Sequence, residues 1–174
     1  MESTALTLGV ITPILSAMSP SLQQELRQSK PFSSLQQEAY LSVVRTTSAL
    51  TDQVEDLLKP YGISGTQFNV LRILRGAGEG GLCRNELRDR MLTRMPDMTR
   101  LLDRMEEAEL VTRSRERDDR RMVLTRITER GRDLLRQLDR PMSELHRDQL
   151  ARLSDVQLRS LIDLLTKVRE GGDG

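Results

Sequence analysis

Arginines gather between Arg84 and Arg132, and the guanidinium group suits one kind of chemistry. Its planar fork donates paired hydrogen bonds to guanine O6 and N7 or to a phosphate. From Arg113 to Arg132 the chain carries eight arginines against four carboxylates, a net formal charge of +4, whereas the whole chain carries only +1. This local excess indicates a polyanionic partner, and we expect double-stranded DNA. The residues expected to take part in that contact are Arg84, Asn85, Thr93, Arg94, Asp97, Thr99, Arg100, Arg104, Arg115, Arg117, Asp119, Arg120 and Arg121.

A helix is expected to hold the first group of these residues. Pro96 suits the first helical position, where no amide hydrogen is needed. An apolar stripe follows at helical spacing, formed by Met98, Leu101, Leu102, Met105 and Ala108. The opposite face carries Asp97, Arg100 and Arg104. Thr93 and Arg94 fall in the turn before this helix.

Two β-strands are expected next, because β-favouring residues recur in segments 110–115 and 122–128. The charged segment 116–121 would close them into a hairpin. A helix followed by an arginine-tipped hairpin is the arrangement of a winged helix-turn-helix, in which the helix enters the major groove and the ribbon lies beside it. We therefore predict a mainly α fold with a small β-hairpin wing, made of a DNA-binding lobe and a helical dimerisation lobe.

The same stretch resembles the MarR family of transcriptional regulators. The resemblance rests on Met98-Thr99-Arg100-Leu101-Leu102-Asp103-Arg104, on Val111 and Arg113, on Asp119-Arg120-Arg121, and on Thr128 with Gly131 behind it. In the order of elements it covers roughly residues 33–170. The resemblance implies that the first and last helices interlock two subunits, and that small, often aromatic or phenolic molecules bind between these helices and the DNA-binding lobe. It also implies that Asp119 pairs with Arg121 across the hairpin.

Glu109 departs from this pattern, since the resembled family usually has a glycine there at the end of the recognition helix. A left-handed residue with a β-carbon costs about 1 to 2 kcal/mol. We therefore expect the turn to be shaped differently in this chain.

The helix offers three candidates for reading DNA at its start. Arg100 is expected to contact a base, and Thr99 to touch a base edge or a phosphate. Asp97 has two interpretations: it accepts a hydrogen bond from a cytosine amine, or it holds Arg100 three residues on.

Arg104 lies deeper along the helix and also has two interpretations. It contacts a base, or it pairs with Asp103, Glu106 or Glu107, which is the interpretation that we favour.

The wing and the supporting helix supply the remaining contacts. Arg117, Arg120 and Arg121 are expected in the minor groove, whose negative potential attracts arginine. Arg84 and Asn85 open the supporting helix, where amide hydrogens and the helix dipole suit a phosphate.

Cys83 and His146 are the only cysteine and histidine, which excludes an intrachain disulfide and a Cys/His zinc cluster. We expect no metal and no cofactor. Cys83 beside Arg84 is a candidate for an oxidant-sensitive thiol, but an inert thiol is favoured, because the redox cysteine of the resembled family lies in the first helix and this chain has none there. His146 is expected at the surface near a helix end.

The remaining elements follow from caps, prolines and helical spacing. Residues 1–32 are read as an N-terminal extension, with a short helix from Ser19-Pro20 to about Lys30. Dimerisation helices are expected at 33–59, stopped by Pro60, and at 128–170, with a kink or break at Pro141 and a cap at Ser154. The winged helix-turn-helix is expected at about 62–128, with helices at 65–75 and 82–91.

Composition limits the alternatives. The chain has 174 residues and 37% apolar content, which suits one compact unit. We expect a cytoplasmic protein without membrane contact, because no basic residue precedes the apolar run near the N-terminus and no segment is long enough to cross a bilayer. Aromatic residues make up only 2%, which argues against a binder of single strands.

These features predict a homodimeric, ligand-responsive repressor that binds a near-palindromic operator and responds to a small-molecule effector. The C-terminal helices carry more leucine than one small winged domain can bury, which favours a dimer. Two alternatives stay open: a winged-helix module that binds a protein, and a thiol-based regulator acting through Cys83. An enzyme is the weakest hypothesis, because the chain has no phosphate-binding loop, no possible Ser/His/Asp triad beyond its single histidine and no metal-ligand spacing.

Overall fold

The computed structural model describes residues 21–115 and 122–171. Two compact units divide the chain, one ending at Thr47 and the other beginning at Ser48. The first unit contains the short helix α1 (Leu22–Glu25), which begins at a capping box formed by Ser21 and Gln24. The predicted helix through Lys30 is wrong, because the chain leaves the helical conformation at Arg27, which has a φ of 50°. The predicted start at Ser19-Pro20 lies outside the described residues.

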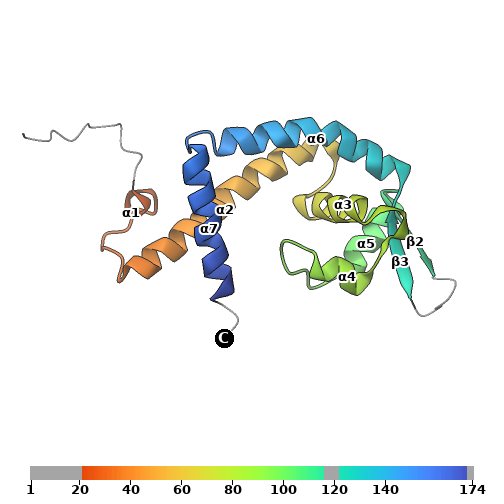
Figure 1. Cartoon of the computed structure of the whole chain (residues 1–174), viewed down its shortest axis with the longest axis horizontal. Coiled ribbons are helices and arrows are strands. Elements are labelled where there is room, and N and C mark those ends of the chain that lie inside the picture. The colour runs from red at the N-terminus through yellow and green to blue at the C-terminus, as the bar shows by residue number, and fades with distance from the viewer. Residues whose placement is uncertain (1–20, 116–121, 172–174) are drawn as a thin grey trace, which may run out of the picture. The chain divides into compact units, whose positions relative to one another are not determined.

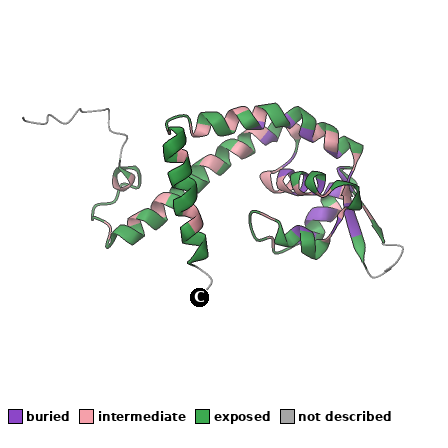
Figure 2. Cartoon of the chain, in the orientation of Figure 1, coloured by how far each residue is buried: buried purple, intermediate pink, exposed green. Residues whose placement is uncertain are grey.

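Helix α2 (Leu35–Leu58) runs through the boundary between the units. Pro60 ends it as predicted, within the 3-10 turn η1 (Lys59–Tyr61). Leu58 is the one buried residue of this helix, whereas Leu35 and Tyr40 are 77% and 68% exposed. Most of the apolar face of α2 is therefore uncovered in the single chain (Figure 2).

A winged helix-turn-helix follows in the second unit (Figure 1). Its helices are α3 (Gly65–Ala77), α4 (Arg84–Asp89) and α5 (Met98–Glu107), with a 3-10 turn η2 (Gly78–Gly80) after α3. Strands β2 (Val111–Arg115) and β3 (Val123–Ile127) form the predicted hairpin. The expected fold class, mainly helical with a small β wing, is confirmed.

The sheet contains a third strand that was predicted as helix. Leu82 and Cys83 form β1 (Leu82–Cys83), which pairs antiparallel with β3, so that the strand order is β1-β3-β2. Helix α4 consequently begins at Arg84 and ends at Asp89, not at the predicted residues 82 and 91. A two-residue strand has no periodicity of its own, and its pairing with Leu124 and Thr125 is visible only in three dimensions.

The core lies between α3, α4, α5 and the sheet, where the buried residues of Figure 2 concentrate. Leu71, Leu74, Leu87 and Met105 have no exposed surface. Each buried large aliphatic side chain contributes about 1.5 to 3 kcal/mol. This packing holds the apolar face of α5 in the core and leaves the opposite face exposed to solvent.

Helix α6 (Glu129–Gln149) packs on α3, and Arg75 of α3 holds Asp139 through two hydrogen bonds of 2.9 Å. Pro141 lies inside α6 without interrupting it, so of the two predicted effects, a kink or an interruption, the interruption is wrong. The last helix, α7 (Asp155–Glu170), begins at Ser154 as predicted. None of the helices in the described ranges has both the length and the apolar character needed to cross a membrane.

Candidate nucleic-acid interface

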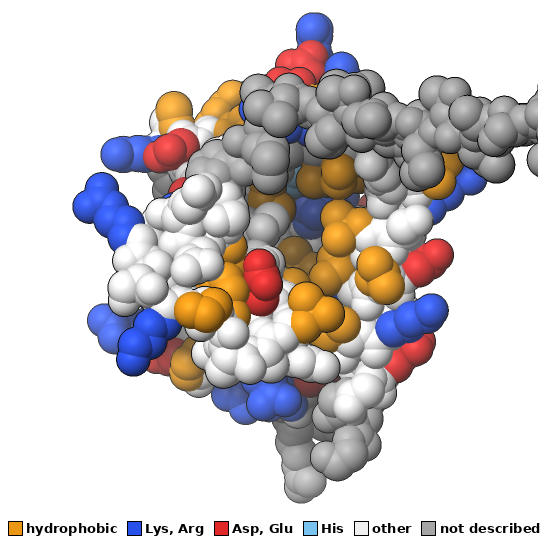
Figure 3. All heavy atoms as spheres, turned by 90° about the vertical axis from the view of Figure 1, so that its left-hand side faces the viewer, with side chains coloured by type: hydrophobic (Ala, Val, Ile, Leu, Met, Phe, Trp, Pro, Cys, Tyr) orange, Lys and Arg blue, Asp and Glu red, His pale blue; other side chains and the backbone are white. Residues whose placement is uncertain are grey.

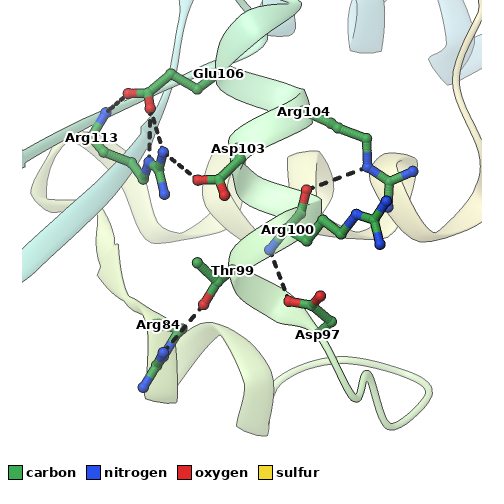
Figure 4. A network of polar contacts seen from close by, with 8 residues as sticks. All are labelled: Arg84, Asp97, Thr99, Arg100, Asp103, Arg104, Glu106 and Arg113. Carbon is green, nitrogen blue, oxygen red and sulfur yellow. Dashed lines mark hydrogen bonds and ion pairs between the residues drawn. The ribbon is translucent and has the colours of Figure 1, made fainter.

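Helix α5 begins at Met98, two residues later than predicted. Asp97 is the N-cap, and its Oδ1 accepts a hydrogen bond of 3.0 Å from the backbone N–H of Arg100. Pro96 is therefore not the first helical residue, because the cap already satisfies an amide of the first turn. Asp97 holds the backbone of Arg100 and not its guanidinium group, which leaves that group free of this carboxylate (Figure 4).

The two faces of α5 differ as the spacing predicted. Met98, Leu101, Leu102 and Met105 are buried, at 5% exposure or less. Ala108, the fifth residue of the predicted stripe, is instead exposed, because it is the C-cap. The opposite face presents Thr99, Arg100 and Arg104, all exposed.

Arg104 does not pair with its neighbouring carboxylates, so the favoured sequence interpretation is wrong. Its Nε donates to the carbonyl oxygen of Arg100 at 3.3 Å, one turn back along the helix. The side chains of Arg100 and Arg104 extend to the same side of α5 (Figure 4). Two cations are thus presented together on the exposed face.

Arg113 of β2 takes the carboxylates instead. Its NH2 group lies 2.6 Å from Asp103 and 2.6 Å from Glu106, and its Nε donates to Glu106 at 2.9 Å. The backbone N–H of Arg113 donates to the second oxygen of Glu106 at 3.0 Å. The hydrogen bonds from Arg113 lower the pKa of Glu106 below its ordinary 4.5, and those from Glu106 and Asp103 raise the pKa of Arg113.

This network was not predicted from the sequence. Arg113 lies on a strand, outside the three- and four-residue spacing that reveals pairs on one helix. Arg113 belongs to the family resemblance, but no role followed from that resemblance alone. The available signal was the pair Asp103 and Glu106, which share one helix face at a spacing of three residues.

Helix α4 brings its first residues beside the start of α5. NH1 of Arg84 donates to Oγ1 of Thr99 at 3.2 Å, and Arg84 and Asn85 are both exposed. They line, together with Thr99 and Cys83, an open cavity of about 380 Å³ between α4, α5 and β3. Three residues predicted to contact DNA are thereby brought together.

Cys83 is half-buried at the N-cap of α4. Its backbone N–H donates to Glu86 at 2.8 Å, and this hydrogen bond lowers the pKa of Glu86 below its ordinary 4.5. A carboxylate therefore stands next to the cysteine, in addition to the arginine that was noted in the sequence.

Thr93 and Arg94 lie in the loop between α4 and α5, as predicted, and both are exposed. The loop is anchored by Met91 and Met95, which pack against the core. Asn69 of α3 donates to the sulfur of Met91 at 3.7 Å. Thr93 and Arg94 are consequently held on a short connection whose two flanks are fixed.

The wing is described only at its base. Arg115 is exposed at the end of β2, opposite Val123. The predicted contacts of Arg117, Asp119, Arg120 and Arg121, and the pairing of Asp119 with Arg121, lie outside the described residues. At the base, Arg126 donates to the carbonyl oxygen of Glu79 at 2.9 Å and to Ser114 at 2.7 Å, which ties the hairpin to the turn after α3.

Glu109 is left-handed, with a φ of 57°. The N–H of Leu110 bonds to the carbonyl of Met105 at 2.9 Å, and the N–H of Glu109 to that of Glu106 at 2.9 Å. These two bonds form the turn for which the family usually has glycine. The expectation of a different turn is wrong, because contacts from α6 hold Glu109 in place: Thr128 donates to its carbonyl at 2.7 Å, and Arg130 pairs with its carboxylate at 2.9 Å.

A second open cavity, of about 390 Å³, lies between α2, α3, α6 and the loop before α5. Its lining is mainly apolar and includes Leu50, Val54, Phe68 and Met142. Polar side chains stand among them: the guanidinium of Arg72 lies 5.9 Å from the centre of the Phe68 ring, and the exposed His146 is near the end of α6, as predicted. Leu92 and Thr93 of the α4–α5 loop line the same cavity.

Comparisons with known proteins agree with this geometry. The model of the MarR family matches residues 61–122, which include α3, α4, α5 and β2. The uncharacterized HTH-type transcriptional regulator YdgJ of Bacillus subtilis is 29% identical over 108 residues, a match that covers 62% of this chain and 65%, just under two thirds, of that protein.

Solved structures give the same result. A MarR transcription factor from Planctomyces limnophilus is 36% identical, with 78% of this chain and 98% of that chain covered and a TM-score of 0.61. A mutant of MarR from E. coli complexed with operator DNA is 26% identical, with 78% and 99% covered and a TM-score of 0.69. These findings confirm the resemblance seen in the sequence. The chain belongs to the MarR family of transcriptional regulators.

Proposed function

We propose that this chain is a sequence-specific repressor that binds duplex DNA as a homodimer and releases it when a small aromatic effector binds. The observation that carries the proposal is helix α5, whose buried face is locked into the core while its exposed face presents Thr99, Arg100 and Arg104. A helix that packs on the core through one face and presents guanidinium groups on the other is suited to reading base edges in the major groove. The operator complex of the E. coli relative supports this reading.

Each exposed residue has a defined role in this proposal. Arg100 donates to guanine O6 and N7, and Arg104 beside it contacts a second base or a phosphate. Thr99 accepts a hydrogen bond from Arg84, so its hydroxyl hydrogen is left for an acceptor on the DNA. Asn85, at the start of α4, contacts the phosphate backbone of the DNA.

The flanking residues extend the contact along the duplex. Thr93 and Arg94 reach phosphates from the loop before α5, and Arg115 does so from the base of the wing. The proposal also assigns the minor groove to Arg117, Arg120 and Arg121, with Asp119 orienting Arg121. Arg121→Ala is expected to weaken operator binding and to flatten its dependence on salt, whereas an unchanged slope would contradict wing contact.

A homodimer is proposed because apolar side chains lie uncovered. On α7, Val156, Ile162, Leu164 and Val168 are each at least 60% exposed. Hydrophobic side chains also lie open between charged ones on the face shown in Figure 3. A twofold dimer that buries them would place two recognition helices about 34 to 36 Å apart, one DNA turn.

The effector is assigned to the cavity lined by Phe68 and Arg72. Its volume lies within the usual range for small-molecule sites, about 300 to 1,000 Å³. The apolar lining suits a ring, and Arg72 and His146 suit an acceptor or anionic group on that ring. Because Leu92 lines the cavity and is 81% exposed, a ligand there would contact the loop that leads into α5. Ligand binding and DNA binding would then favour different positions of this loop.

Selection of bound fragments from random duplex DNA tests the DNA-binding part. The expected result is an inverted repeat whose half-site centres are about 10 base pairs apart, bound by a dimer in sedimentation analysis. Arg100→Ala serves as the comparison variant, and the fragments that it selects are expected to share a less specific sequence than those selected by the wild type. Failure of the wild type to enrich any duplex, with no salt-sensitive complex formed, would instead favour a protein-binding module.

A simple aromatic carboxylate, 1-naphthoate, tests the effector site. We expect it to weaken the protein–DNA complex of the wild type, and to do so less in Arg72→Leu. Arg75→Leu is the matched control, because Arg75 pairs with Asp139 and does not line the cavity. If 1-naphthoate weakened the DNA complexes of both variants equally, the assignment of the effector to this cavity would be wrong.

A further inference from the structure

Helix α5 carries more negative than positive charge. From Asp97 to Glu107 it has two arginines against four carboxylates, a net formal charge of −2. A duplex presents one phosphate charge per about 1.7 Å of its axis, so such a helix would be repelled unless its carboxylates are countered or turned away. Charge balance is therefore a condition for DNA recognition by this particular helix.

Arg113 meets that condition for two of the four carboxylates. Asp103 and Glu106 are three residues apart on α5, so they project from one face and a single guanidinium reaches both. The side chain of Arg113 is only 26% exposed, and the backbone N–H of Arg113 adds a further hydrogen bond to Glu106. The guanidinium group and the backbone N–H of Arg113 thus both hold the recognition helix to the wing.

Arg100 and Arg104 are left without a carboxylate partner by this arrangement. Asp103 and Glu106 are engaged on one side of α5, and Arg100 and Arg104 lie together on another side (Figure 4). Without Arg113 the two carboxylates would be left uncompensated, and Arg100, three residues before Asp103 on the same helix, would be within reach of one of them. Arg113 therefore determines which arginines of the helix remain available.

We propose that Arg113 is a positioning residue for DNA recognition, which withdraws Asp103 and Glu106 from the interface and so keeps Arg100 and Arg104 free to contact DNA. This inference rests on the proposed DNA-binding function. It also explains how α5 can bind DNA although it carries carboxylates that would otherwise weaken that binding.

Removal of the Arg113 charge, followed by removal of the two carboxylates that it pairs with, tests the proposal. We expect Arg113→Gln to weaken binding of the selected operator by at least about tenfold, because two uncompensated carboxylates then repel the phosphates and Asp103 can pair with Arg100. Adding Asp103→Asn and Glu106→Gln removes those carboxylates, and the triple variant is expected to return to within about threefold of the wild type. Affinities are measured by fluorescence anisotropy at several salt concentrations. Arg75→Gln, which breaks an exposed ion pair between α3 and α6, is the control and should bind as the wild type does.

Two results would overturn the proposal. A triple variant that stays as weak as Arg113→Gln, with a salt slope reduced by about one, would mean that Arg113 itself touches a phosphate. An Arg113→Gln variant that binds like the wild type would mean that the network has no effect on recognition. If Arg113→Gln alone fails to fold in urea titrations, the wild type and the triple variant still decide the question. Absence of operator binding by the wild type would refute the proposed function and is thus distinguishable from failure of the rescue.

Discussion

Thr128 holds Glu109, because its Oγ1 donates a hydrogen bond of 2.7 Å to the carbonyl oxygen of Glu109. The same hydroxyl oxygen accepts from the backbone N–H of Gly131 at 3.1 Å. The residue that caps α6 therefore also stabilises the turn that ends α5.

Thr128→Val keeps the shape of the side chain and removes both hydrogen bonds. We expect it to lower the free energy of unfolding by about 1 to 2 kcal/mol, the usual cost of a lost cap, in urea titrations. Thr128→Ser retains the hydroxyl and should stay within about 0.5 kcal/mol of the wild type. Equal losses in both variants would show that the hydroxyl is not the stabilising group.

Glu109→Gly is expected to raise the free energy of unfolding by about 0.5 to 1 kcal/mol. Glycine adopts a φ of 57° without strain, and this gain exceeds the greater freedom that it gives to the unfolded chain. Glu109→Ala is the control: it keeps the β-carbon and loses only the exposed ion pair with Arg130, so no increase is expected. A decrease for Glu109→Gly would show that this turn has no backbone strain to relieve.

Local features of the chain could be predicted from the sequence, whereas contacts between distant residues could not. Four of the five residues in the predicted stripe of α5 are buried, and the two strands of the wing were predicted correctly, because each depends on local periodicity. The conformation of Glu109 was predicted wrongly, because its cost was known but not the contacts from Thr128 and Arg130 that offset it. Those contacts join residues about twenty positions apart and cannot be read from spacing.

The candidate site likewise combines features that the sequence predicted with features that it did not predict. The exposure of Arg100 and Arg104 followed from the helical pattern. The pairing of Asp103 and Glu106 with Arg113 did not, since it depends on how β2 lies against α5. Likewise, β1 arises only because β3 offers an edge to Leu82 and Cys83.

Gly131→Ala is expected to lower the free energy of unfolding by about 1 to 3 kcal/mol. A β-carbon there would lie 2.5 Å from the carbonyl oxygen of Leu110 and 2.8 Å from the side chain of Ile127, so the start of α6 would have to move away. Gly76→Ala is the matched control, because a β-carbon at Gly76 meets nothing within 4 Å, and it should stabilise the helix by about 0.4 to 1 kcal/mol. Thermal or urea unfolding of both variants measures the difference, and similar effects at the two positions would contradict the close approach.

The stability contributed by Glu106 is expected to depend on pH. Its pKa is lowered in the folded protein by the hydrogen bonds from Arg113, so its contribution is fully present above the ordinary value of 4.5 and is lost as the pH falls through the folded value. The difference in free energy of unfolding between the wild type and Glu106→Gln should therefore be largest near neutral pH and shrink below about pH 4.5. Urea titrations across this range test the sign, and a difference that grows in acid would show that Glu106 is not stabilised as the anion.

The most direct test of DNA recognition by α5 is the affinity of wild type and Arg100→Ala for the selected operator and for operators changed at single guanines, measured at several salt concentrations. The account predicts a steep fall of wild-type affinity with salt, by a slope of about −0.9 for each phosphate contacted. It also predicts that Arg100→Ala loses about 1 to 3 kcal/mol on the operator and no longer distinguishes one guanine from its substitutes. Wild-type affinity that does not change with salt, or a variant that keeps full discrimination at every guanine, would contradict it.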